Sequence, residues 1–196
     1  MAPKCPLHLF PLNPQVMQSL SLSIDPNLVV GDLDSVSEAE REWLNQSGVE
    51  IVLAPIEKDE SDLELAIISV VNRGYSRILI VGALGNRLDH TLANIFLMAL
   101  PVLQNCDVRL DDGHVEVSLI QKETQILGKI GDLVSLIPIN GPVSGVATVG
   151  LYYPLIEETL HPFYSRGISN HLIGEKATVI VKSGWLLCIH TRGLND

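Results

Sequence analysis

Two carboxylates separated by one residue follow a short apolar run near the start of the chain. Residues 28–31 form the run, and Asp32 and Asp34 come directly after it. An apolar run that ends at glycine is typical of a buried strand, and open α/β sheets bind their ligands at the carboxyl ends of such strands. Side chains two residues apart on an extended chain point the same way, so this pair could hold one Mg²⁺ ion. A turn in which the Asp side chains accept from backbone amides is the alternative interpretation.

A second polar segment follows the next predicted strand, residues 49–54. It contains Asp59, Ser61 and Asp62, and Ser61 with Glu64 has the spacing of a capping box at a helix start. Free backbone amides and the helix dipole at such a start favour an anion or a phosphate group. An ordinary acidic helix start, with no ligand, is the alternative.

A third polar segment, residues 82–90, follows a predicted strand at residues 77–81 and contains Arg87, Asp89 and His90. Arg87 stands at a predicted helix start, where a cation opposes the helix dipole, and this favours an anionic ligand beside it. A surface ion pair between Arg87 and Asp89 is the alternative. His90 alone is a weak signal, because a single histidine in a helix is more often a packing or capping residue than a catalyst.

Strands and helices alternate up to Pro101, which predicts an α/β domain with a Rossmann-like parallel sheet over residues 1–112. Within it, residues 1–27 carry five prolines and no clean period. They are therefore expected to be an irregular lead-in with one short helix near residues 15–20.

Residues 113–196 show a different pattern, because short apolar runs are separated by turn signals. This predicts a C-terminal antiparallel β-sandwich, with hairpin turns at residues 140–142 and 183–184. The connection at residues 155–174 is too long for a hairpin. Its polar loop, residues 165–170, is therefore a candidate for binding.

Composition narrows the class of partner. The chain has 196 residues, 46% of them apolar, and a formal charge of −10, with a mean hydropathy of +0.28. This charge argues against a nucleic acid or an anionic membrane as the main partner. Three widely spaced cysteines without a CxxC pair suit reduced thiols, and the sequence has neither an 18-residue apolar run nor a signal peptide. A cytoplasmic protein with small ligands is expected.

Several common catalytic motifs are missing from the chain. It has no GxxxxGK[ST] phosphate loop, no GxGxxG after a strand and no GxSxG elbow. What remains is a set of carboxylates and one arginine at successive strand ends. These groups suit phosphoryl transfer, in which a metal ion and a cation neutralise phosphate oxygens and a carboxylate orients the attacking hydroxyl.

Four motifs in this order resemble those of the thiamin pyrophosphokinase family. They are residues 31–35 (family pattern GD[FL]DS), 59–62 (DxTD), 82–90 (GxxGxRxDH) and 165–170 (SxGxSN), within a similarity that covers residues 28–190. The resemblance implies transfer of a pyrophosphoryl group from ATP to the hydroxyl of thiamin, giving thiamin diphosphate and AMP, with Mg²⁺ required. It also implies an α/β nucleotide domain followed by a β-sandwich, paired as a homodimer with the site between subunits.

The same resemblance implies the residue roles. Catalytic roles fall to Asp32, Asp34, Asp62, Arg87 and Asp89, and the metal ligands among them are Asp32, Asp34 and Asp62. The nucleotide side consists of Ser35, Asp59, Ser61, Arg87 and His90, and the thiamin side of Ser165, Arg166, Ser169 and Asn170. Because an alcohol has a high pKa, Asp89 is expected to orient the thiamin hydroxyl and accept its proton late.

The sequence departs from the family in its first part. An ADGGA-type strand end, which the family carries before GD[FL]DS, has no match in residues 1–27, so the early strand is expected to be missing through truncation or divergence. A non-catalytic relative that binds thiamin or nucleotide is therefore one alternative. A magnesium-dependent phosphatase of the haloacid dehalogenase type, with Asp32 as nucleophile and Asp34 beside it, is the other.

Overall fold

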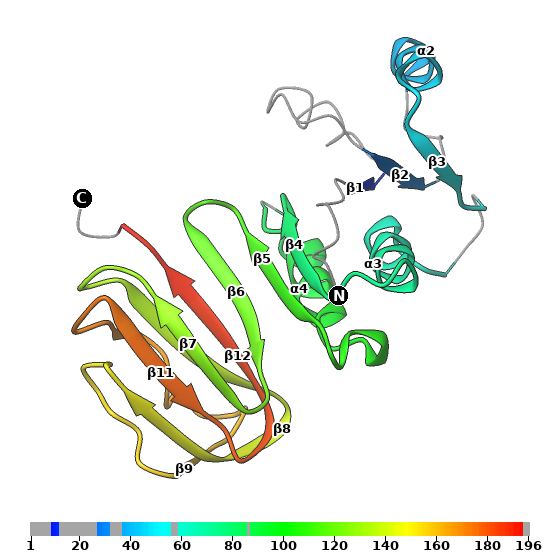
Figure 1. Ribbon diagram of the computed structural model, residues 1–196. Coiled ribbons are helices and arrows are strands. Elements are labelled where there is room, and N and C mark those ends of the chain that lie inside the picture. The colour runs from blue at the N-terminus through cyan, green and yellow to red at the C-terminus, as the bar shows by residue number, and fades with distance from the viewer. Residues whose placement is uncertain (1–8, 12–26, 32–36, 56–58, 86, 194–196) are drawn as a thin grey trace. The chain divides into compact units, whose positions relative to one another are not determined.

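The structure is a computed structural model that describes residues 9–11, 27–31, 37–55, 59–85 and 87–193 (Figure 1). The chain divides into two compact units. The first contains residues 1–76 and 101–106, and the second contains residues 77–100 and 107–196. No helix in the described ranges is long and apolar enough to cross a membrane.

The first unit is built on a parallel sheet with helices packed on its central strand. The sheet has the order β1 (Leu9–Pro11), β2 (Leu28–Gly31) and β3 (Glu50–Leu53), and the helices are α2 (Glu38–Ser47) and α3 (Asp62–Asn72). On β2, Val29 packs with Leu44 of α2, whereas Leu28 and Val30 pack with Ala66 of α3. Because successive strand residues point to opposite faces, the two helices cover opposite faces of β2.

The strand β1 corrects one expectation from the sequence. It pairs parallel with β2, with Leu9 opposite Leu28 and Pro11 opposite Val30, so a strand does lie before residues 28–31 and the prediction that it is missing was wrong. The helix predicted near residues 15–20 lies outside the described residues.

The second unit contains a nine-stranded sheet. The elements of this unit are β4 (Arg77–Val81), α4 (Leu88–Leu97), β5 (Asp107–Asp111), β6 (Val115–Ile120), β7 (Glu123–Leu127), β8 (Leu133–Val149), β9 (Glu158–Leu160), β10 (Asn170–His171), β11 (Lys176–Ile180) and β12 (Ser183–Thr191). The short 3₁₀ helix η1 (Pro101–Leu103) lies between α4 and β5 in the sequence but belongs to the first unit. The main strand order is β4-β5-β6-β12-β8-β11-β7, and β9 and β10 also pair with β8. The β4–β5 pair is parallel and the other pairs are antiparallel.

The long strand β8 replaces the hairpin predicted at residues 140–142. Asn140 and Gly141 adopt φ values of 60° and 115° inside the strand, and the residues before and after them pair mainly with different partners. Residues 133–139 pair with β12, and residues 147–149 pair with β11. The positive φ values therefore curl the sheet instead of reversing the chain.

The turn signal at residues 183–184 also has a different outcome. β11 pairs with β7 and β8, whereas β12 pairs with β6 and β8, so the connection crosses between strands that are not partners. Gly184 has a φ of 102°, and a Cβ atom there would lie 2.9 Å from the Pro142 carbonyl oxygen. Glycine permits this close crossing.

The curled sheet encloses the main hydrophobic core. Fifteen buried residues form one cluster, and it includes Ile120 of β6, Leu136 of β8, Leu160 of β9, Val179 of β11 and Leu186 of β12. The antiparallel strands predicted for the C-terminal part are therefore present. The Rossmann-like sheet predicted for residues 1–112 is not confirmed, because its parallel strands are divided between β1-β2-β3 and the β4–β5 pair.

Candidate functional site

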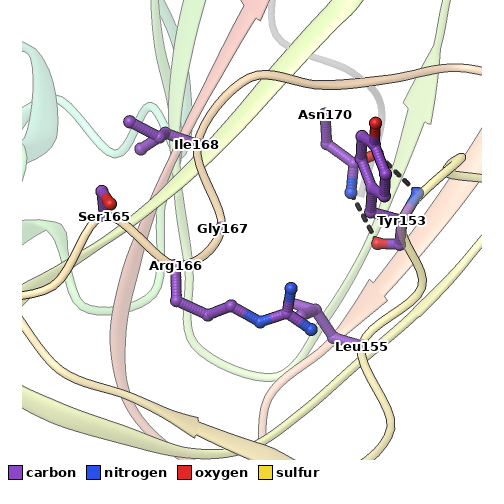
Figure 2. A pocket seen from close by; sticks show the side chains of 7 residues that line it. All are labelled: Tyr153, Leu155, Ser165, Arg166, Gly167, Ile168 and Asn170. Atoms are coloured by element: carbon purple, nitrogen blue, oxygen red, sulfur yellow. Dashed lines mark hydrogen bonds between the residues drawn. The ribbon is translucent and has the colours of Figure 1, made fainter.

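A pocket lies beside the polar loop that the sequence singled out. It has a volume of about 400 Å³ and is lined by Tyr153, Leu155, Ser165, Arg166, Gly167, Ile168 and Asn170 (Figure 2). Three of the four residues predicted for the thiamin side, Ser165, Arg166 and Asn170, therefore line one cavity. The fourth, Ser169, is exposed and adjoins it in sequence.

Asn170 fixes one wall of this pocket. Its side chain is buried, and its Nδ2 donates to the Tyr153 carbonyl oxygen at 2.7 Å. Its Oδ1 accepts from the backbone N–H groups of Tyr153 and His171, both at 3.0 Å. Figure 2 shows the two bonds to Tyr153 as dashed lines. One amide thus ties two segments 17 residues apart in sequence, and the pocket wall is set before any ligand arrives.

The opposite side of the loop rests on β8. Gly167 has a φ of 102°, its carbonyl accepts from the Leu136 N–H at 2.9 Å, and a Cβ atom on it would lie 2.7 Å from the Leu136 oxygen. Ser169 has a φ of 56° and donates its N–H to Ser135 Oγ at 3.1 Å. At position 167 only glycine fits without displacing β8, so the loop packs against this strand in one conformation.

Arg166 contributes the formal charge at the pocket. Its Nε and Nη2 donate to the two carboxylate oxygens of Glu158 at 2.9 and 2.6 Å. The Arg166 guanidinium lowers the pKa of Glu158, mainly through this hydrogen bonding. The pair is therefore a two-bond ion pair between the loop and β9.

Aromatic side chains pack on Tyr153, which lines the pocket. Tyr152 stacks on His171 with ring centroids 4.6 Å apart and planes at 21°. Tyr153 packs edge to face against Tyr152, with ring centroids 4.8 Å apart. Of these rings, Tyr153 lines the pocket, and its face offers flat apolar surface for a ring-shaped ligand.

The segment after β3 forms the predicted helix start. Ser61 is the N-cap of α3, and its hydroxyl accepts from the Glu64 N–H at 3.2 Å. The capping prediction is thus confirmed, and the Ser61 hydroxyl is engaged with the helix. Asp62 is the first residue of α3, and Asp59 is exposed in the loop before it.

At the start of α4 the structure shows the ion pair that the sequence left as an alternative. Arg87 donates to Asp89 through Nη2 at 2.5 Å and through Nε at 3.2 Å. Their side chains are 70% and 65% exposed. The hydrogen bond from Arg87 lowers the pKa of Asp89 to about 2. His90, the next residue, is exposed in the same helical turn.

The metal prediction rests largely on residues outside the described part of the chain. Asp32, Asp34 and Ser35 fall there, as does Asn86. Within the described ranges, no three His, Cys, Asp or Glu side chains are grouped closely enough to hold a metal ion. The metal ligands and the roles of the other site residues therefore remain predictions.

Sequence reasoning missed three residues that shape the pocket: Tyr153, Leu155 and the Arg166 partner Glu158. The adjacent aromatic pair at residues 152–153 was the available signal. Glu158 gave none, because its link to Arg166 depends on how the 155–174 connection folds. Trp185 is half-buried on β12 opposite Ile139.

Two family profiles of known proteins match this chain, and together they span most of it. The family profile "Thiamin pyrophosphokinase, catalytic domain" matches residues 8–110. The profile "Thiamin pyrophosphokinase, vitamin B1 binding domain" matches residues 117–186. The pocket and its loop fall within the second match.

Individual relatives agree with these matches. Thiamine pyrophosphokinase of Bacillus subtilis is 29% identical over 174 residues, which are 88% of this chain and 81% of that protein. Thiamine pyrophosphokinase 3 of rice is 28% identical over 79% of this chain, and the aligned part spans 61% of the rice protein. The crystal structure of the Bacillus subtilis enzyme aligns with a TM-score of 0.86 at 28% identity, covering 96% of this chain and 88% of that one.

Together with the fold and the pocket, these matches define a kinase with a catalytic part and a vitamin-binding part. The chain belongs to the thiamin pyrophosphokinase family, as its motifs predicted.

Proposed function

We propose that this chain transfers the pyrophosphoryl group of ATP to the hydroxyl of thiamin, giving thiamin diphosphate and AMP. The observation that carries the proposal is that Ser165, Arg166 and Asn170 line one pocket of about 400 Å³. This volume is in the range of small-ligand sites. Membership of the family favours this reaction over a phosphatase of the haloacid dehalogenase type and over a binding protein without turnover.

The pocket is proposed to hold the two rings of thiamin. Tyr153, Leu155 and Ile168 offer apolar surface, and Ser165 and Ser169 lie on the loop beside them. Asn170 already uses its amide on the backbone of Tyr153 and His171. In this proposal Asn170 supports thiamin by fixing the shape of the pocket wall.

The donor set of the predicted metal site fits Mg²⁺. Asp32 and Asp34 follow the end of β2, and Asp62 begins the helix after the neighbouring parallel strand β3. Carboxylate oxygens are the ligands that Mg²⁺ prefers. A bound ion would neutralise phosphate oxygens of ATP, whereas the three carboxylates would fix its position. Ser35, Asp59, Ser61 and His90 complete the proposed nucleotide side.

Arg87 and Asp89 are proposed to act on the reacting groups. The thiamin hydroxyl oxygen forms a bond to the β-phosphorus of ATP, the bond from that phosphorus to the AMP oxygen breaks, and the hydroxyl proton is released. When Arg87 binds phosphate, it leaves Asp89 free to accept a hydrogen bond from the thiamin hydroxyl. The pKa of Asp89 is about 2 beside Arg87 and moves toward the ordinary value of about 4 when Arg87 leaves it. In both states Asp89 is charged at neutral pH and is a weak base, so it orients the hydroxyl more than it deprotonates it.

The assembly is proposed to be a homodimer in the cytoplasm. Phe163, Ile156 and Tyr164 are 92%, 79% and 71% exposed on the second unit, and large exposed apolar side chains support an interface. The widely spaced cysteines suit a reducing compartment.

The decisive experiment measures AMP release with ATP, Mg²⁺ and thiamin. We expect AMP only when all three are present, and we expect Asp89→Asn to lower kcat by about 100-fold, with an unchanged circular dichroism spectrum. Asp107→Asn is the matched control, because Asp107 also pairs with an arginine two residues away, Arg109, and lies outside the proposed site. Equal activity in the Asp89 variant and the control would refute the assignment. Thiamin binding without turnover would favour the binding protein.

A further inference from the structure

The pocket carries a charge that ought to oppose the proposed substrate. Of the described residues that line it, Arg166 is the one with a formal charge. Thiamin contains a thiazolium ring with a fixed positive charge, and like charges at close range repel. A pocket for this ring therefore needs a way to cancel the guanidinium.

Glu158 supplies that counter-charge. Both of its carboxylate oxygens accept from Arg166, at 2.9 and 2.6 Å. The side chains of Arg166 and Glu158 are 52% and 35% exposed. Glu158 does not itself line the pocket, so its effect reaches the ligand through Arg166.

Both members of the pair are held on the same strand, β8. Glu158 pairs with Val146, and Leu160 of the same short strand pairs with Val143. Arg166 precedes Gly167, which rests against Leu136. In Figure 2 the Arg166 side chain runs along the pocket toward Leu155. The guanidinium thus has a fixed direction at the pocket edge.

We propose that Glu158 is a positioning residue that fixes and neutralises Arg166, so that this pocket accepts a cationic ring. The inference rests on the proposed function, since it takes the cationic ring to be the thiazolium of thiamin. It predicts that removing the charge of Glu158 turns the pocket edge positive. Cationic ligands then bind more weakly, while neutral ligands of the same shape do not.

The test is calorimetric binding of two probes to the whole protein: thiamin, and an analogue with an uncharged ring in place of the thiazolium. We expect Glu158→Gln to raise the thiamin Kd about fivefold and to change the analogue Kd less than twofold. Added salt should reduce the thiamin effect, because it screens the unpaired guanidinium. Adding Arg166→Met to Glu158→Gln should lower the thiamin Kd relative to Glu158→Gln alone.

The matched control is Glu157→Gln. Glu157 is the neighbouring residue, and it forms an exposed ion pair with Lys182 at 2.9 Å, away from the pocket lining. Equal effects of the two Glu variants, equal weakening of both probes, or a thiamin effect that salt does not change would each overturn the proposal. Thiamin-dependent AMP release by the unaltered protein tests the proposed function separately, and the Kd ratios can be read even without turnover.

Discussion

The pocket beside residues 165–170 and the start of α4 differ in how their polar groups are held. In the pocket, Asn170 is 4% exposed and makes three hydrogen bonds to backbone groups. At the start of α4, the Arg87 and Asp89 side chains are 70% and 65% exposed and bond to each other. The pocket is therefore built by folding. The charged pair instead lies open to solvent, where a phosphate can compete for Arg87.

Hydrophobic packing separates the pocket from α4 in the same way, because Leu155 of the pocket lining belongs to the cluster enclosed by the curled sheet. The cluster enclosed by the curled sheet has fifteen buried residues. By contrast, α4 (Leu88–Leu97) contains no buried residue. Substitutions around the pocket should accordingly cost stability, whereas substitutions of the exposed charges should cost activity alone.

The largest expected loss of stability comes from Asn170→Ala. It removes three hydrogen bonds and leaves the part-buried N–H and C=O groups of Tyr153 without these partners, so we expect the free energy of unfolding to fall by about 3 kcal/mol. Thiamin affinity should fall with it. Urea denaturation measures the first effect and calorimetry the second.

Asn94→Ala is the control for that change. Asn94 is half-buried and makes one bond, from Nδ2 to the Ala83 carbonyl at 2.9 Å. It should cost about 1 kcal/mol. A similar cost at both positions would mean that the pocket wall is not specially fixed.

Gly167→Ala should have the next largest effect. The new Cβ would lie 2.7 Å from the Leu136 oxygen at a φ of 102°, so strain and steric overlap together should cost about 2 kcal/mol. Gly113→Ala has a φ of 91° but no atom within 4 Å of the new Cβ, and it should cost about 1 kcal/mol. The difference between their urea midpoints isolates the contact with β8. If the two urea midpoints did not differ, the loop around Gly167 would be able to move away from β8.

A smaller loss of stability is expected when acid protonates Asp132, a buried residue directly before β8. Burial alone would raise its pKa, but hydrogen bonds from the backbone N–H groups of Lys129 and Gly193 and from His190 lower it overall. A lowered folded pKa means that this stabilisation is complete above the ordinary aspartate pKa of about 4 and is lost as the pH falls through the folded pKa. Stability measured between pH 6 and pH 3 should therefore decline, and Asp132→Asn should decline less steeply. If stability fell equally with pH in the unaltered protein and in Asp132→Asn, Asp132 would not have this stabilising role.

Local signals in the sequence predicted the parts of the structure that local chemistry decides. Ser61 caps α3 because its hydroxyl meets an N–H three residues away, and the strand at residues 77–81 has the predicted bounds. The loop at residues 165–170 was predicted as a binding segment from its polarity and length, and it lines the pocket.

The features that sequence reasoning missed depend on contacts between distant segments. Whether Asn140 and Gly141 turn the chain or curl a strand depends on the partners of β8 on either side. The pairing of β1 with β2 depends on the register between two strands that are not adjacent in the sequence. The bond between Glu158 and Arg166 forms only once both segments lie on β8.

The smallest expected effect on stability is that of Arg87→Met. Because both members of its ion pair are exposed, the urea midpoint should not change measurably, whereas turnover should fall because a phosphate ligand is lost. The pKa of Asp89 should rise from about 2 toward the ordinary value of about 4, since the hydrogen bond from Arg87 is its main cause. A ¹³C NMR titration of the Asp89 carboxyl measures this shift in the folded protein. If the pKa stayed near 2 in the variant, backbone groups would be holding the carboxylate. The start of α4 would then be as fixed by folding as the pocket.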